Sequence, residues 1–226
     1  MQRSCNHRAG VGLRLTGPKK PAPATKQPSN QSMRKLKREE MARPSAEELA
    51  AMPRHPVTAV LENIRSIHNV GSIFRTADAA RIERLVLTGI TGTPAHRKLR
   101  KTSLGAEETV PWQHDDDAGA AVRRQQACGR TVVALEVTDS PTDVDELTLD
   151  AFPVCLLLGN ELDGVSESLL QEADHALSIP QFGRKQSLNV SVAFGIAAFN
   201  LVRRYRRLRG LPKRLTVERG TWKVEG

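Results

Sequence analysis

Two stretches decide the fold: VCLLLGNELDGVSESLL at residues 154–170 and SIPQFGRKQSLNVSVAFGIAAFN at residues 178–200. Each begins with a short apolar run typical of a buried strand, breaks into a polar loop that contains glycine, and continues as a helix. Alternating strands and helices of this kind build α/β sheets. Because ligands of such sheets bind beyond the carboxyl ends of the strands, the two loops are candidates for the functional site.

The rest of the body repeats this alternation of strand and helix. The fully apolar strands predict a mostly parallel sheet with helices on both faces. We expect strands at 57–62, 84–89, 131–137, 153–158 and 176–180, and helices near 70–80, 116–128, 166–173 and 189–209. A basic loop through Lys101 follows the second strand, and SAEE at Ser45–Glu48 has the capping-box pattern of a short helix.

Composition divides the chain into four segments. Residues 1–32 are rich in Pro, Lys, Gln, Ser and Gly without apolar periodicity, so we expect a disordered basic tail. Residues 33–55 are expected to form a short helical extension, 56–210 the folded domain, and 211–226 a C-terminal tail.

Several classes of protein are disfavoured by the sequence. No apolar run approaches the roughly 18–20 residues that span a bilayer, and the N-terminus lacks a secretory signal pattern, which favours a cytoplasmic protein without membrane contact. The cysteines, Cys5, Cys128 and Cys155, have no CxxC spacing. We therefore expect neither a disulfide nor a zinc site.

The net charge of +9 is concentrated near the N-terminus. Residues 1–43 contain eleven Lys or Arg against two Asp or Glu, whereas the remaining residues contain 23 of each kind. Within this neutral body, cations gather at 97–101 and 203–214, and acids at 115–117 and between 139 and 150. Clustered cations release counterions when they bind phosphates, so this segregation favours a nucleic-acid partner. Solvated helix faces are the alternative.

A polar loop at 62–80, ENIRSIHNVGSIFRTADAA, follows the first predicted strand. Asn69 is expected to be the N-cap of the next helix, on which Arg75 and Asp78 lie one turn apart. Arg75 is either a functional cation or only the i,i+3 partner of Asp78, and the spacing leaves both interpretations open.

The loops in the two quoted stretches also allow two interpretations. In GNELDGV at 159–165, the glycines let the backbone approach a ligand and the acids can accept hydrogen bonds, but an ordinary turn fits equally. In QFGRKQSLN at 181–189, the following helix presents an amino end that can hold an anion, but Ser187 and Asn189 can be plain caps. No G-x-G-x-x-G or Walker pattern is present, which disfavours those two kinds of nucleotide site.

Taken together and in this order, the three loops resemble the motifs of one family. They contain N-V-G-x-I-x-R-T-A-D at 69–78, G-N-E-x-x-G at 159–164 and I-P-x-x-G-x-x-x-S-L-N-V-S-V-A at 179–193. Over roughly residues 56–207, the chain resembles the SpoU (TrmH-type) RNA 2′-O-ribose methyltransferases of the SPOUT superfamily. The third motif is the most specific of the three.

The resemblance implies a fold, a cofactor and an assembly. It implies that 56–210 is a SPOUT methyltransferase domain with a C-terminal trefoil knot at about 154–200, a feature that pattern alone does not predict. It further implies a homodimer that packs its knotted segments together and holds S-adenosylmethionine inside the knot.

The resemblance also assigns roles to particular residues. The catalytic set it implies is Asn69, Arg75, Glu161, Ser187 and Asn189. The cofactor-binding set is Leu158, Gly159, Asn160, Gly164, Ile179, Gln181, Ser187 and Leu188. The sequence departs from some members at Tyr205, where they carry an arginine.

The clustered cations are the expected RNA contacts, because phosphate contacts position a nucleic acid. This RNA-binding set is Arg65, Arg97, Lys98, Arg100, Lys101, Arg203 and Arg206. The segment before the folded domain is too short to resemble the separate substrate-binding domain of some ribosomal enzymes, which favours transfer RNA over ribosomal RNA.

The chemistry suggests how two of these residues act. A guanidinium is a poor base because its pKa exceeds about 12, so we expect Arg75 to orient the ribose hydroxyl and stabilise developing negative charge. Glu161 is the alternative proton acceptor. Two other functions stay open: a non-catalytic RNA-binding protein in ribosome assembly that retains the knot fold, and a base N-methyltransferase of another SPOUT branch.

Overall fold

A computed structural model describes residues 34–35, 37, 45–212, 216–218 and 221–223. Every element below belongs to the compact unit that spans residues 43–226. The tail predicted at 1–32, together with Cys5, lies outside the described residues. Within the described part of the chain, no helix is long and apolar enough to cross a membrane.

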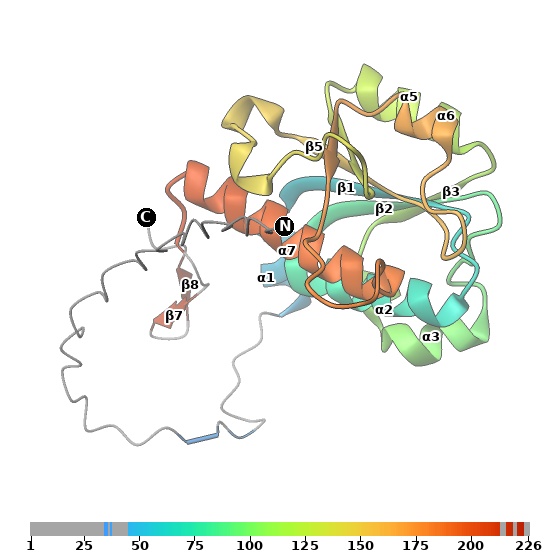
Figure 1. Ribbon diagram of the computed structural model, residues 1–226. Helices are drawn as coiled ribbons and strands as arrows, with labels where there is room; N and C mark the ends of the chain where they lie inside the picture. The colour runs from blue at the N-terminus through green and yellow to red at the C-terminus, as the bar shows by residue number, and fades with distance from the viewer. Residues whose placement is uncertain (1–33, 36, 38–44, 213–215, 219–220, 224–226) are drawn as a thin grey trace, which may run out of the picture. The chain divides into compact units, whose positions relative to one another are not determined.

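Six parallel strands form the central sheet, in the order β3-β2-β1-β5-β4-β6 (Figure 1). In chain order they are β1 (His55–Glu62), β2 (Ile82–Thr88), β3 (Trp112–Asp115), β4 (Thr131–Leu135), β5 (Val154–Leu158) and β6 (His175–Leu177). Because all pairs are parallel, the loops that follow the strands emerge at one edge. The predicted parallel sheet is confirmed, and β3 is a strand that the sequence did not reveal.

Helices cover both faces of the sheet. On one face lie α2 (Ile67–Ala80) and α7 (Val190–Leu208), and on the other lie α5 (Ala118–Ala127) and α6 (Glu167–Leu170) (Figure 1). Strand β5 is buried at every position, with Val154, Leu156 and Leu158 in the core under α2 and α7, and Cys155 and Leu157 in the core under α5 and α6. Burial on both sides explains why this strand is uninterruptedly apolar.

Helix α2 begins one turn earlier than the sequence suggested. Ser66 is its N-cap, and the Ser66 hydroxyl accepts the Asn69 N–H at 3.4 Å. The prediction that Asn69 caps this helix is therefore wrong, because serine caps as well as asparagine does and occurs earlier in the chain. Asn69 lies inside the first turn instead, which leaves its side-chain amide available for other contacts.

The basic segment through Lys101 is helical, so the loop predicted there is also wrong. Helix α3 (Arg97–Ser103) buries Leu99 completely and is followed by α4 (Ala106–Thr109). It packs closely against α2 at Gly71, where an added Cβ would come within 2.7 Å of the Thr102 Cβ. Tertiary packing, and not an apolar period, stabilises this short helix.

Other predicted elements are present with shifted ends. Helix α7 is capped by Asn189 and ends just before Gly210, as expected, whereas β4, α6 and β6 are shorter than predicted. The capping box at Ser45 is confirmed before α1 (Ala46–Ala51). Two short 3-10 turns, η2 (Val144–Glu146) and η3 (Leu149–Ala151), precede β5, and an antiparallel hairpin of β7 (Thr216–Glu218) and β8 (Thr221–Lys223) follows α7.

Candidate functional site

The carboxylate of Glu161 joins the first two sequence motifs. Its Oε2 accepts the Arg65 N–H at 3.0 Å, and its Oε1 accepts the Ser66 N–H at 3.1 Å. Oε1 also accepts a hydrogen bond from Asn69 Nδ2 at 2.8 Å, which is the third bond to this carboxylate. Glu161, on the loop after β5, is thereby fixed to the amino end of α2.

Asn69 extends this connection to the third motif. Its Oδ1 accepts a hydrogen bond from Asn189 Nδ2 at 3.0 Å. Asn189 in turn caps α7, because its Oδ1 accepts the N–H of Ser191 at 2.9 Å and the Ser191 hydroxyl at 2.7 Å. One hydrogen-bonded chain, from Glu161 through Asn69 and Asn189 to Ser191, thus links three loops that are distant in sequence.

The environment of Glu161 favours its charged form. Partial burial opposes ionisation, but the hydrogen bonds from Arg65 N–H, the Asn69 amide and Ser66 N–H outweigh it, and the pKa of Glu161 lies below its ordinary value of 4.5. A carboxylate that accepts three hydrogen bonds at neutral pH has a low proton affinity. Glu161 is therefore suited to positioning its neighbours and poorly suited to accepting a proton.

The loop at 159–165 is closed on itself. Asn160 and Gly164 exchange two main-chain hydrogen bonds of 3.1 Å each, and Asn160 Oδ1 accepts the N–H groups of Leu162 and Asp163. A Cβ on Gly159 would come within 1.8 Å of the Gly164 carbonyl carbon, and Gly164 has a φ of 71°. Both glycines are therefore required by the shape of the loop.

The loop between β6 and α7 offers exposed polar groups. Between Ile179 and Leu188, no main-chain group in this described segment hydrogen-bonds to another main-chain group. Residues 181–189 are all exposed, Ser187 and Leu188 among them, and Gln181 Nε2 donates to the Ile179 carbonyl at 2.9 Å. Peptide donors and acceptors beside exposed apolar carbons suit a ligand that has both polar edges and apolar surface.

Arg75 is not part of this hydrogen-bonded chain. It is exposed on α2, and its side chain forms no hydrogen bond or ion pair with any residue that the structure describes. Asp78, its i,i+3 neighbour, instead accepts a hydrogen bond from the Thr109 hydroxyl at 2.6 Å. Six residues along a helix correspond to a rotation of about 120°, so Arg75 points away from Asn69.

The predicted RNA-binding cations have different environments. Arg65, Arg97, Lys98, Lys101 and Arg203 are exposed with no side-chain partner among the described residues, and the exposed Arg100 donates through Nε to the Pro94 carbonyl at 2.9 Å. Arg206 instead is half-buried: its Nε donates to the Pro212 carbonyl at 2.9 Å and its Nη1 to His55 Nε2 at 3.1 Å. Arg206 therefore connects the end of α7 to β1.

Helix α7 presents an apolar stripe to solvent. Val192, Ile196 and Phe199 are 50%, 37% and 42% exposed, and Leu188, just before the helix, is 40% exposed. Their spacing of four, four and three residues places them on one side of the helix. The neighbouring helix α2 approaches this segment at Gly195, where an added Cβ would lie 3.6 Å from the Thr76 side chain.

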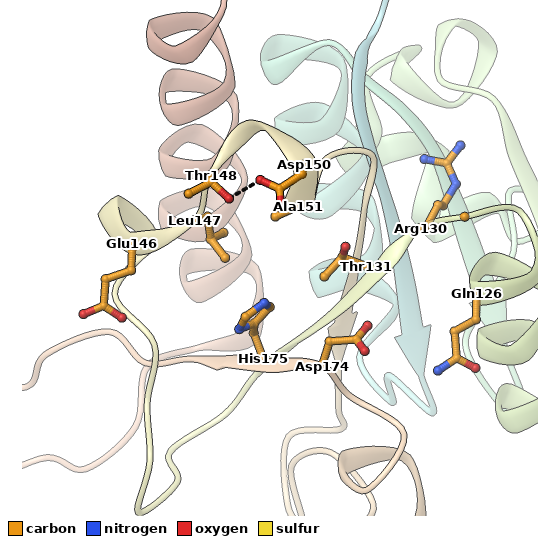
Figure 2. Close-up of a pocket in the computed structure, with 11 residues that line it drawn as sticks. Gln126, Arg130, Thr131, Glu146, Leu147, Thr148, Asp150, Ala151, Asp174 and His175 are labelled. Atoms are coloured by element: carbon orange, nitrogen blue, oxygen red, sulfur yellow. Dashed lines mark hydrogen bonds between the residues drawn. The ribbon is translucent and has the colours of Figure 1, made fainter.

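A cavity of about 610 Å³ lies away from these loops (Figure 2). It is lined by Thr131 and His175, the first residues of β4 and β6, by Ala151 just before β5, and by Gly129 after α5. It therefore opens at the amino ends of the strands, and none of the motif residues lines it.

Two carboxylates at the opposite, carboxyl edge were not predicted from the sequence. Glu62 ends β1 and Glu136 follows β4, and each accepts a main-chain N–H beyond Gly164. A single acid at the end of an apolar strand carries no pattern of its own, so only the fold could reveal them.

Known proteins share this sequence and this fold. The model of the SpoU rRNA Methylase family matches residues 56–199. A tRNA (guanosine(18)-2′-O)-methyltransferase of Thermus thermophilus is 34% identical over 167 residues, which cover 74% of this chain and 84% of the relative. A 23S rRNA (guanosine-2′-O-)-methyltransferase, RlmB of Haemophilus ducreyi, is 29% identical over 156 residues, which cover 69% of this chain.

A solved structure of an RNA methyltransferase is also similar to this chain. The AdoMet-bound rRNA methyltransferase from Sinorhizobium meliloti superposes with a TM-score of 0.60 at 32% identity, over 67% of this chain and 56% of that one. The chain spans 63% of the length of the Haemophilus relative, so parts of both of these longer proteins have no counterpart in the match.

Proposed function

Because the chain belongs to the SpoU rRNA methylase family, we propose that it transfers a methyl group from S-adenosylmethionine to a ribose 2′-hydroxyl of structured RNA in the cytoplasm. The observation that carries this proposal is the hydrogen-bonded chain from Glu161 through Asn69 to Asn189, which draws the three motifs together. These hydrogen bonds hold the three loops in the arrangement that a single site formed by all of them needs.

The loops after β5 and β6 have the chemistry to hold S-adenosylmethionine, which supplies an electrophilic methyl group when bound. Leu158, Gly159, Asn160 and Gly164 would contact it from one loop, and Ile179, Gln181, Ser187 and Leu188 from the other. The peptide groups between Ile179 and Leu188 support this assignment, because none of them pairs with another main-chain group and they can pair with the polar edges of a nucleoside. The trefoil knot at about 154–200 belongs to the same proposal.

Alignment of the ribose hydroxyl with the methyl donor would account for most of the rate enhancement. S-adenosylmethionine would supply its methyl carbon to the ribose oxygen, the sulfur would keep the electron pair of the broken bond, and the hydroxyl proton would pass to solvent water. Good alignment of two reactants contributes up to about 7–11 kcal/mol. Asn69 and Asn189 are held in fixed orientations at the edge of the site, and we assign them to orienting the ribose. The low pKa of Glu161 supports a positioning role for this residue.

A homodimer would bring Arg75 into the site. The exposed stripe of Val192, Ile196 and Phe199 needs an apolar partner, and a second copy of the chain supplies the same stripe. Arg75 adjoins Thr76, whose side chain lies near Gly195 of α7, so Arg75 is on the helix beside the stripe, and we propose that a partner on the stripe brings its own site within reach of this guanidinium. From there Arg75 can contact the ribose or its phosphate and stabilise developing negative charge.

Transfer RNA is the substrate we favour over ribosomal RNA. The exposed cations of α3, with Arg65 and Arg203, are the phosphate contacts that we propose for this substrate. Mapping 2′-O-methyl sites in total RNA, with and without the gene, tests the choice: loss of a site in transfer RNA supports it, and loss of a site in ribosomal RNA refutes it.

Calorimetry and one variant test the enzymatic role. The wild-type chain is expected to bind S-adenosylmethionine, and Arg75→Ala is expected to abolish methyl transfer while the affinity for S-adenosylmethionine stays within about threefold. A folded chain without measurable affinity would instead be an RNA-binding module. Unchanged turnover in Arg75→Ala would remove Arg75 from the mechanism.

A further inference from the structure

Two carboxylates clamp the segment that follows loop 159–165. The Glu136 Oε2 atom accepts the Val165 N–H at 3.0 Å, and the Glu62 Oε2 atom accepts the Ser166 N–H at 2.9 Å. Glu62 ends β1 and Glu136 follows β4, the two strands that flank β5 in the sheet. Two consecutive amides are thus held from both sides of the strand that carries the loop.

The burial of Glu62 indicates that this contact has a role. Glu62 is only 6% exposed, and neither Glu62 nor Glu136 forms an ion pair with a residue that the structure describes. Removing an ionised carboxylate from water is costly unless hydrogen bonds compensate for it. Hydrogen bonds to a charged acceptor are about twice as strong as neutral ones, so these two hold the backbone firmly.

Gly164 gives independent support for the contact of Glu136 with the loop. A Cβ at Gly164 would come within 2.2 Å of Glu136 Oε2, so the carboxylate occupies the space that any side chain would need. The second oxygen of Glu136 accepts the Val137 N–H at 2.8 Å, which fixes its orientation. The position of the Glu136 carboxylate therefore requires a glycine at residue 164.

Helix capping does not explain the arrangement. A capping acid accepts from the second or third amide inside the helix. Here the carboxylates accept from Val165 and Ser166, which precede the first residue of α6, and α6 has only four residues. The Glu136 contact with Val165 therefore holds the end of the loop, and the Glu62 contact holds Ser166, the N-cap residue of α6.

We propose that Glu62 and Glu136 are positioning residues that set the affinity of loop 159–165 for the methyl donor. This inference rests on the proposed function, because it takes the donor to be S-adenosylmethionine. By fixing Val165 and Ser166 before any ligand arrives, the two carboxylates remove part of the ordering cost of binding. Loss of either contact then weakens binding without removing a group that touches the reacting atoms.

Variants of Glu136 in the full chain test the clamp by calorimetry with S-adenosylmethionine. Glu136→Ala is expected to weaken binding by about tenfold or more, whereas Glu136→Gln, which keeps an acceptor oxygen for Val165 N–H, is expected to stay within about threefold. Glu167→Ala is the matched control, since it removes an exposed acid beside the clamped amides and should leave the affinity unchanged. In steady-state assays, KM for the donor should rise in Glu136→Ala while kcat is retained.

Amide hydrogen exchange in the ligand-free protein separates the clamp from the proposed function. Protection of Val165 and Ser166 is expected to fall about tenfold in Glu136→Ala and in Glu62→Ala, whatever the protein binds. Failure of the wild-type chain to bind S-adenosylmethionine overturns the proposed function, while the exchange rates still report on the clamp. Unchanged donor affinity in Glu136→Ala, or a Gln variant as weak as the Ala variant, overturns the inference.

Discussion

Replacing Asn69 with alanine breaks the hydrogen-bonded chain at its centre. The change removes the hydrogen bond to Glu161, whose acceptor is charged, and the hydrogen bond from Asn189, which is neutral. Hydrogen bonds to charged groups contribute about 1.5–3 kcal/mol and neutral ones about 0.5–1.5 kcal/mol. Both bonds lie at an exposed edge where water can replace them, so we expect a net loss of about 2 kcal/mol, toward the lower end of the sum.

This loss should appear in catalysis. A cost of about 2 kcal/mol in transition-state alignment corresponds to a fall of about 30-fold in kcat/KM. The assay is the initial rate of transfer of a radiolabelled methyl group to RNA, measured at several RNA concentrations. The same two hydrogen bonds belong to the folded protein without ligand, so the melting temperature should also fall, by about 4–8 °C.

A control and a clear refutation accompany this variant. Gln171→Ala also removes a side-chain amide, at an exposed position just after α6 that has no side-chain partner among the described residues, and its rate should equal that of the wild type. A rate for Asn69→Ala within twofold of wild type would refute the idea that the connection between the motifs aligns the substrate.

Three further predictions concern pH, assembly and RNA binding. Burial, with the nearby Arg206 charge, holds the pKa of His55 below its ordinary value of 6.5. As the pH falls, His55 therefore takes up a proton in the unfolded chain before it does so in the folded protein, and stability should decline below about pH 6.5 until His55 protonates in the folded state. In a plot of melting temperature against pH, His55→Gln should remove this decline. Parallel plots for the wild type and the variant would contradict the assignment to His55. We expect the wild-type chain to be the proposed dimer in light scattering and Ile196→Asp, which places a charge in the apolar stripe, to be a monomer; a wild-type chain that is already monomeric would refute the proposed interface. Arg203→Ala should raise KM for RNA at an unchanged melting temperature, whereas Arg206→Ala should lower the melting temperature because it breaks the contacts with His55 and Pro212.

The sequence predicted the parts of the fold that depend on local pattern. Strand β5 could be recognised because all five of its residues are buried and apolar, and α7 because Asn189 and Gly210 mark its ends. Helix α3 could not be recognised, since its position depends on the burial of Leu99 and on the close approach of Thr102 to Gly71 of α2. Local pattern identifies elements, but it does not reveal which elements support one another.

The candidate site was likewise predictable only where local sequence pattern determines it. The motifs identified Asn69, Glu161 and Asn189, but the contacts among them depend on a fold that brings residues about a hundred positions apart together. Composition also treated Arg203 and Arg206 alike, although one is exposed and the other is bonded to Pro212. Three residues along a helix are enough to move a side chain from the solvent to a partly buried contact.

Nucleoside analysis of RNA treated with the purified protein and S-adenosylmethionine tests the central claim most directly. The account predicts one methyl group on a ribose 2′-oxygen, detected by mass spectrometry and by resistance of that linkage to alkaline cleavage. A methyl group on a base would contradict the account, as would unmodified RNA in the presence of a folded protein that binds S-adenosylmethionine.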